Sequence, residues 1–313
     1  MQQIYGLAAA RLEQPSLVTI GVFDGVHRGH QHLLRRLVAQ AHADGRLAVV
    51  QSFFPHPDVV LRGLTGRYYL TSPEQKAALL ADLGVDVLVT QTFDDALRQV
   101  RAGDYVDLLL DRLQMRALWI GPDFALGYRR EGDAAYLRQR GAAAGFELHV
   151  VDLLAGGGPE AIRSTAIRQA LGDGDVEQAR ALLGRPYTVA GPVVQGDRRG
   201  HLIGFPTANV GVWEQQMVPA NGVYAGWATL GADRLMAVTN VGVRPTFDGQ
   251  AVTVEAYLLD FDATIYGQEL ALTFERRLRP EMKFSGIDAL VAQIRADAEA
   301  GRAYLSDQSL GTR

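Results

Sequence analysis

Apolar residues follow two different spacings in the first half of the chain. Short apolar runs predict strands at 17–23, 47–53, 85–89, 117–120 and 146–151. Between these runs, apolar residues recur every three or four positions, which predicts helices at about 31–45, 105–113 and 134–144. A further helix is expected from Ser72 onward, with Ser72 as its cap, Pro73 in its first turn and Gln75 completing a capping box. Strands that alternate with helices predict a parallel sheet with right-handed crossovers.

The second half of the chain has a different rhythm. Runs separated by Gly, Pro, Asp and Asn predict six strands at 187–194, 202–210, 223–230, 235–241, 252–261 and 270–277. An amphipathic helix follows, with Ile287, Leu290, Val291, Ile294 and Ala298 on one face. This half therefore predicts an antiparallel sheet or small barrel with a C-terminal helix. Two short helices around 171–185 mark the change, and we expect domains at 1–183 and 184–313.

Composition narrows the class of protein. The 313 residues are 48% hydrophobic and 21% charged, with a net charge of −4 and no cysteine. These values are typical of a folded globular chain without disulfides or thiolate chemistry, and they show no basic bias toward nucleic acid. No signal peptide or membrane span is visible. We therefore expect a cytoplasmic protein that acts on small molecules, with no membrane association and no obligate protein partner.

The lysine count excludes one common way of binding ATP. Only Lys76 and Lys283 are present, against 29 arginines, and neither lysine follows a glycine. A Walker A loop ending in Gly-Lys-Ser/Thr is therefore impossible. Any ATP chemistry is expected to use histidine, arginine, backbone N–H groups and metal.

The stretch Gly21-Val-Phe-Asp-Gly-Val-His-Arg-Gly-His30 is the first candidate site. It joins the first predicted strand to a helix, where oriented N–H groups and the helix dipole favour an anion. Gly25 and Gly29 allow close approach of backbone to a ligand. His27 and His30, three positions apart, are expected on the same side of the first helical turn. Two histidines in a turn are also typical of capping or core packing.

Together with Ile162-Arg-Ser-Thr-Ala-Ile-Arg168, this stretch resembles the nucleotidylyltransferase superfamily, and most closely the FMN adenylyltransferase part of bacterial bifunctional riboflavin kinase/FAD synthetases. The resemblance covers nearly all of 15–305. It implies a Rossmann-like α/β domain followed by a mainly antiparallel six-stranded β-barrel with a C-terminal helix.

Adenylyl transfer suits these residues, because a phosphate nucleophile needs no general base. The protein has to position two anions and stabilise charge that grows in the transition state. His27 and His30 are the expected catalytic donors. The other nucleotide-binding residues expected here are Gly21, Phe23, Asp24, Gly25, Gly29, Ser164, Thr165 and Arg168.

Within this site, Ser164 and Thr165 are expected to cap their helix and Arg168 to bind phosphate. The resemblance implies that Asp24 lies near the phosphates and that Asp123, in Gly121-Pro-Asp-Phe-Ala-Leu-Gly127, binds flavin. Arg163 replaces the serine usual in the family. His56, between two prolines, needs no function and is not assigned to the site.

A second candidate site lies in Gly191-Pro-Val-Val-Gln-Gly-Asp-Arg-Arg-Gly-His-Leu-Ile-Gly-Phe-Pro-Thr-Ala-Asn209. Gly196 and Gly200 bracket a charged loop suited to covering phosphates. Thr207 and Asn209, two apart, are expected to face the same way on a strand and to share Mg²⁺ with ATP. Turn chemistry after proline is the alternative reading.

Pro-Thr-Ala-Asn resembles the signature of the riboflavin kinase domain. That resemblance implies that Glu255 is the catalytic base for the riboflavin 5′-hydroxyl, although a glutamate on a strand is commonly a solvated surface residue. It also implies that Arg279 and Phe284, in Arg279-Pro-Glu-Met-Lys-Phe284, frame the flavin.

The resulting hypothesis is a bifunctional enzyme. It uses ATP and Mg²⁺ to convert riboflavin to FMN, and then ATP to convert FMN to FAD and pyrophosphate. Two alternatives are transfer of a nucleotide to another phosphorylated metabolite, and a flavin-binding sensor with an inactive transferase domain. The kinase-like second half argues against the first, and the complete set of phosphate-site residues argues against the second.

Overall fold

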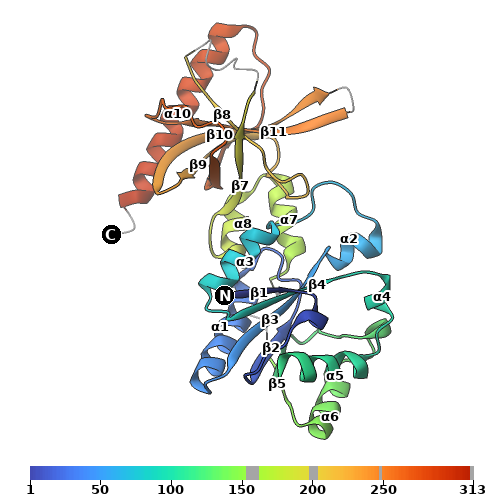
Figure 1. The fold of residues 1–313 in the computed structure, drawn as a ribbon. Helices are drawn as coiled ribbons and strands as arrows, with labels where there is room; N and C mark the ends of the chain where they lie inside the picture. The colour runs from blue at the N-terminus through green and yellow to red at the C-terminus, as the bar shows by residue number, and fades with distance from the viewer. Residues whose placement is uncertain (153–161, 197–203, 247–248, 311–313) are drawn as a thin grey trace. The chain divides into compact units, whose positions relative to one another are not determined.

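The computed structural model describes residues 1–152, 162–196, 204–246 and 249–310, and it divides into two compact units, Met1–Ser164 and Thr165–Arg313. The first unit has the predicted alternation of strands and helices (Figure 1). Its elements are β1 (Gln2–Tyr5), β2 (Ser16–Ile20), α1 (Arg28–Ala43), β3 (Leu47–Phe54), α2 (Pro57–Arg62), α3 (Pro73–Asp82), β4 (Val87–Thr92), α4 (Asp95–Arg98), α5 (Ala102–Leu113), β5 (Met115–Ile120), α6 (Ala134–Ala144) and β6 (Glu147–Val150).

All six strands of this unit form one parallel sheet in the order β1-β4-β3-β2-β5-β6. Strand β2 is central and buried along its whole length, which explains its continuous apolar run. Its Leu17 packs in the core under α1 and α3, and Val18 packs in the core under α5 on the opposite face. The predicted parallel α/β fold is thus confirmed, and it places the ends of β2 and β5 at the same edge.

The second unit is a closed barrel with helices outside it. Its elements are α7 (Ser164–Asp173, whose first residue belongs to the first unit), α8 (Val176–Leu183), β7 (Tyr187–Val194), β8 (Ala208–Val210), β9 (Gly222–Leu230), β10 (Asp233–Thr246), β11 (Gly249–Leu258), β12 (Glu269–Phe274), β13 (Arg276–Arg279) and α10 (Ile287–Leu310).

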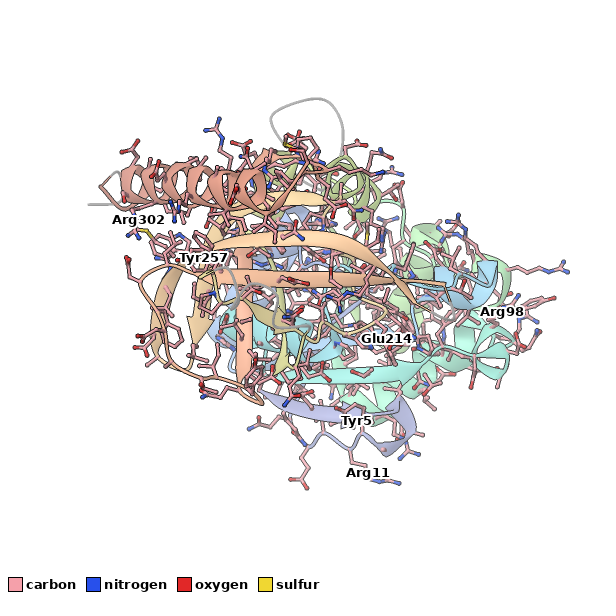
Figure 2. The ribbon with its side chains drawn as sticks, turned by 90° about the horizontal axis from the view of Figure 1, so that it is seen from above. Tyr5, Arg11, Arg98, Glu214, Tyr257 and Arg302 are labelled. Atoms are coloured by element: carbon pink, nitrogen blue, oxygen red, sulfur yellow. The ribbon has the colours of Figure 1, made fainter. Side chains whose placement is uncertain are left out.

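Antiparallel pairing runs β10-β11-β8-β7-β12-β9, and a further pairing of β9 with β10 closes the ring of six strands. Strand β13 pairs with β9 beyond the end of β12. Helix α10 packs against β9 and β10, and Figure 2 shows it along the barrel, with Arg302 on the helix and Tyr257 on the strands below. The predicted barrel and C-terminal helix are confirmed.

Several boundaries differ from those predicted. The strand expected at 202–210 is confined to Ala208–Val210 among the described residues, and the last predicted strand is split into β12 and β13. Strand β1 was not predicted, because an exposed four-residue edge strand has no apolar alternation. No helix of the described residues is long and apolar enough to cross a membrane.

Candidate functional sites

The turn that follows β2 has an unusual backbone. Phe23 and Val26 have φ angles of 52° and 40°, and Gly25 has a φ of 78°. Positive φ is rare for residues with a side chain, and it is most costly for a β-branched one such as Val26. The N–H of Gly25 donates to Thr71 Oγ1 at 3.3 Å, which fixes the turn from outside. The chain therefore holds a specific conformation before α1 begins.

The two histidines of this turn lie together, as predicted. Their rings stack with centroids 3.5 Å apart and planes at 19°. His27 caps α1, with its Nδ1 accepting the backbone N–H of His30 at 3.3 Å. Because Nδ1 is an acceptor, a neutral His27 ring carries its proton on Nε2. The cap thus fixes which nitrogen of His27 can donate.

His30 is held in its neutral form. Burial is the main cause that lowers its pKa well below the usual value, and the charges of His27 and Lys76 lower it further. Its Nδ1 is buried and, within the part of the chain that the structure describes, has no hydrogen-bond partner. A buried ring nitrogen without a partner is a position where a ligand group improves the hydrogen bonding.

Asp24 serves as an anchor in this structure. Its carboxylate accepts the backbone N–H groups of Leu70 (2.9 Å) and Thr71 (3.3 Å), and the residue is 3% exposed. Its carbonyl accepts the hydroxyl of Ser164 at 3.0 Å. Asp24 therefore connects the turn to two distant segments, and its predicted place near the phosphates stays a prediction.

The segment before α7 reaches the same turn. The carbonyl of Ile162 lies 3.8 Å from where a Cβ on Gly29 would stand, and His27 lies 3.2 Å from that position. Helix α7 begins at Ser164, so this serine is inside the first turn and uses its hydroxyl on Asp24 instead of capping. Thr165 and Arg168 follow in α7 within the second unit, and their contacts with phosphate remain predictions.

Asp123 is brought to this segment by the loop after β5. Its carboxylate lies 3.4 Å from the Arg163 guanidinium, and its carbonyl accepts Arg130 at 2.7 Å. Both side chains of the Asp123–Arg163 pair are mostly exposed, at 81% and 69%. The pair is therefore weak enough to open for a ligand. Arg163 is the residue that departs from the family pattern, and here it has an identified partner.

Lys76, which sequence reasoning assigned to no site, also reaches the turn. It lies on α3, is 8% exposed, and donates to the carbonyl of Val22 at 3.4 Å and to Ser52 Oγ at 2.8 Å. The available signal was the helix start at Ser72, which predicts a helix but not what its lysine contacts.

The barrel unit contains a cavity of about 310 Å³. Four predicted residues, Thr207, Glu255, Arg279 and Phe284, lie in its wall. The other lining residues are Phe205, Val223, Val238, Asn240, Tyr257, Glu281, Met282, Leu290, Ile294 and Asp297. Sequence reasoning missed most of these, although Leu290 and Ile294 lie on the predicted apolar face of the last helix. The wall of the cavity is thus partly apolar and partly formed by polar and charged side chains.

Two predicted residues meet on neighbouring strands beside this cavity, of which Glu255 lines the cavity and Asn209 does not. Asn209 on β8 is the direct register partner of Glu255 on β11, so their side chains face the same way. A Cβ on Gly196 would collide with the Asn209 amide, so a larger residue here would require that side chain to move. Gly200 lies outside the described residues. Glu255 forms an ion pair with the Arg244 guanidinium at 3.4 Å.

Arg279 is committed to a partner inside the protein. Its Nε lies 3.0 Å from Asp297 Oδ1 and its second guanidinium nitrogen lies 2.8 Å from Oδ2. The guanidinium also lies 5.7 Å from the centre of the Phe284 ring. Arg279 therefore fixes α10 against the barrel and shapes the cavity wall that Phe284 completes.

The two sites fall in the two regions that known families match. A family described as FAD synthetase matches residues 9–166, and one described as riboflavin kinase matches residues 183–305. A crystal structure described as a macrolide-efflux protein from Streptococcus pneumoniae shares the fold, with a TM-score of 0.88 and 29% identity over 96% of this chain and 99% of that chain.

Curated relatives cover both regions at once. The bifunctional riboflavin kinase/FMN adenylyltransferase of Listeria monocytogenes is 37% identical over 93% of this chain and 92% of its own. The enzyme of the same name from Escherichia coli K12 is 37% identical over 93% of each chain. The one from Haemophilus influenzae is 36% identical over 98% of this chain and 100% of its own. The chain belongs to the bifunctional riboflavin kinase/FMN adenylyltransferase family.

Proposed function

We propose that the barrel unit transfers the γ-phosphoryl group of ATP to the 5′-hydroxyl of riboflavin, giving FMN and ADP. The parallel-sheet unit then transfers the adenylyl group of a second ATP to the FMN phosphate, giving FAD and pyrophosphate. The observation that carries the proposal is that each unit brings its own predicted residues together: His27 with His30 in one, and Thr207 with Glu255 in the other.

The kinase reaction needs a group that accepts a proton from a neutral alcohol. Glu255 is the carboxylate assigned this role, since it lines the cavity that is proposed to hold riboflavin. The apolar wall made by Val238, Leu290 and Ile294 suits the isoalloxazine ring of riboflavin. The sugar-alcohol chain then extends toward Thr207 and Glu255.

Adenylyl transfer needs positioning and charge stabilisation only. The FMN phosphate attacks the α-phosphorus of ATP, and the bond to the β-phosphate breaks as pyrophosphate leaves. We assign His27 Nε2–H and the neutral His30 ring to the α-phosphate oxygens as hydrogen-bond donors, with Phe23 and the start of α1 as the backbone cradle and Gly25 allowing close approach of the nucleotide. The exposed Asp123–Arg163 pair borders the flavin side.

The donor set beside the barrel cavity fits Mg²⁺. The Thr207 hydroxyl, the Asn209 amide and the Glu255 carboxylate offer hard oxygen ligands, and the Glu255 register with Asn209 sets two of them side by side. We assign the metal to Thr207 and Asn209, where it screens the charge of the ATP phosphates. Among the described residues no group of three or more His, Cys, Asp or Glu could hold a metal by itself, so phosphate and water complete this site.

The proposed domains are 1–183 for FMN adenylyltransferase and 184–313 for riboflavin kinase. Both reactions consume ATP, so we place the enzyme in the cytoplasm, acting on small molecules without an obligate protein partner.

A single assay tests the function. The purified chain is incubated with riboflavin, ATP and Mg²⁺, and the flavins are separated by chromatography over time. We expect FMN first and FAD afterwards, and neither after Mg²⁺ is chelated. FMN alone would indicate an inactive transferase unit, and absence of both products would contradict the proposal.

Two variants separate the sites. His30→Ala is expected to reduce FAD formation from FMN at least 100-fold and to leave FMN formation unchanged, since one positioned donor is worth about that much. Glu255→Gln is expected to have the reverse effect. Loss of both activities in either variant would contradict separate sites.

A further inference from the structure

Lys76 brings a buried charge to the phosphate turn from an unrelated part of the sequence. It lies on α3, 54 positions beyond Val22, and its ammonium donates to the Val22 carbonyl at 3.4 Å. It also donates to Ser52 Oγ at 2.8 Å, and the Ser52 hydroxyl in turn donates to the same carbonyl at 2.9 Å. The carbonyl of Val22 is therefore held by two donors on one side.

Holding this carbonyl also sets the direction of the next N–H. In a trans peptide the C=O and N–H groups point in opposite directions. With the Val22 oxygen fixed toward Lys76, the N–H of Phe23 points away from it. Phe23 is 4% exposed, and among the described residues its N–H has no hydrogen-bond partner. A buried N–H is costly unless something accepts it, so this group is suited to a ligand oxygen.

The positive charge of Lys76 also favours an anion near the Val22–Phe23 peptide. Burial lowers its pKa to about 8, while the Asp24 carboxylate partly opposes that change. The ammonium is thus mostly protonated at neutral pH. Lys76, Asp24 and Tyr69 line one small cleft beneath the turn, and the charge of Lys76 also lowers the pKa of His30. A positive charge therefore lies on the carbonyl side of the Val22–Phe23 peptide, opposite its N–H.

We propose that Lys76 is a positioning residue for adenylyl transfer, which holds the Val22–Phe23 peptide so that the Phe23 N–H faces the reacting phosphate. The proposal rests on the proposed function of the first unit. Lys76 itself touches no substrate in this scheme.

This role predicts an effect on turnover more than on binding. Negative charge grows on the α-phosphate oxygens in the transition state, and a donor aimed there beforehand stabilises that state without rearrangement. If the Phe23 N–H loses this orientation, kcat falls, whereas the KM values for ATP and FMN change little.

The main test is Lys76→Met in the full-length chain, because methionine keeps the length of the side chain but removes its charge and donors. We expect kcat for FAD formation from FMN to fall about 10- to 100-fold. FMN formation from riboflavin, measured on the same preparation, should stay within about twofold and reports the folded barrel unit. Asp82→Asn, an exposed charge change on the same helix, is the matched control and should leave both rates unchanged.

A stability measurement separates positioning from structural support. Among the described residues Lys76 is buried without an ion-pair partner, and a buried unpaired charge is costly, so an apolar side chain of similar length should not destabilise the fold. We therefore expect the unfolding temperature of Lys76→Met to equal or exceed that of the wild type while FAD formation falls. A fall in activity that merely follows a fall in unfolding temperature would overturn the proposal.

The pH profile gives a further readout. As Lys76 loses its proton above pH 8, kcat for FAD formation should fall, and Lys76→Met should lack this fall. The other titratable groups facing Lys76 or sharing its surroundings are Asp24, His30, Tyr69, Glu74 and the amino group of Met1. An alkaline fall of the wild-type rate that Lys76→Met retained in full would overturn the proposal.

The outcomes also distinguish this inference from the proposed function. If the wild type makes no FAD, the function assigned to the first unit fails. If the wild type makes FAD and Lys76→Met makes it at the same rate, or differs from it only in KM, the function holds and the role of Lys76 is refuted.

Discussion

At the scale of single residues, His30 combines burial with a place where an anion has to bind. A charged imidazole would attract phosphate, yet burial and the charges nearby keep this ring neutral in the free protein. A neutral ring still donates through one N–H, and it does so without first losing a strongly held shell of water. His30 therefore does not attract phosphate by charge, but it offers one N–H donor in a fixed position.

This arrangement predicts a stability loss in acid. In the unfolded chain His30 takes up a proton as pH falls through about 6.5, whereas the folded ring resists it. Unfolding then binds protons, so stability falls with decreasing pH, by up to about 1.4 kcal/mol per pH unit. Urea unfolding of the first unit between pH 7 and 5 should show this, and His30→Asn should reduce the slope. An unchanged slope in the variant would contradict the neutral ring.

The residues of the turn could be predicted because they act over short distances in sequence. His27 and His30 are three apart, so the helix that follows decides their stacking. The contact of Lys76 with Val22 could not be predicted in this way. It depends on how α3 packs against the sheet, and no spacing pattern encodes a contact between two segments 54 residues apart.

At the scale of elements, the features that could be predicted again depend on residues close together in the sequence. Ser72 and Gln75 form the predicted capping box: Ser72 Oγ accepts the Gln75 N–H at 3.2 Å, and the Gln75 side chain accepts the Ser72 N–H at 3.1 Å. The apolar face of α10 was also predicted. The polar contact that attaches this helix was not predicted. Asp297 of the helix accepts a hydrogen bond from Arg279 on strand β13, and no spacing pattern within the helix indicates that contact.

The Arg279–Asp297 pair predicts how firmly α10 is attached. The side chains are 15% and 7% exposed, so removing one partner leaves a buried charge uncompensated. Asp297→Ala should lower the free energy of unfolding of the barrel unit by about 3 kcal/mol. It should also raise the KM for riboflavin, since Leu290 and Ile294 of the same helix line the cavity. Chemical unfolding and kinase kinetics measure the two effects.

Arg302→Ala provides the matched comparison on the same helix. Arg302 pairs with Asp260 at 2.6 Å, but these side chains are 48% and 73% exposed. Such a pair is worth less than about 1 kcal/mol. If both variants destabilised the unit equally, the loss would come from removal of any charge from α10 and not from the buried pair.

At the scale of the whole molecule, the sequence predicts two domains and the structure has two units, but they divide the chain at different places. The change of rhythm near residue 184 suggests that the barrel begins there. By contacts, the second unit begins at Thr165 and so includes most of α7 and all of α8. The physical reason lies in polar contacts with the barrel strands: Arg277 donates to the carbonyl of Asp173, and Arg180 pairs with Glu275.

These contacts predict which unit depends on α8. Arg180 donates to Glu275 at 2.6 Å, and Glu275 is only 5% exposed, so Arg180→Ala leaves a buried carboxylate without that partner. In the full-length chain this change should lower the stability of the barrel unit by about 3 kcal/mol. Calorimetry can assign the affected transition, because riboflavin stabilises only the unit that binds it. Arg98→Ala, in an exposed pair of the first unit, should shift neither transition by more than about 1 kcal/mol. If Arg180→Ala instead moved the transition that riboflavin leaves unchanged, α8 would belong energetically to the adenylyltransferase domain, as the proposed boundary at 183 has it.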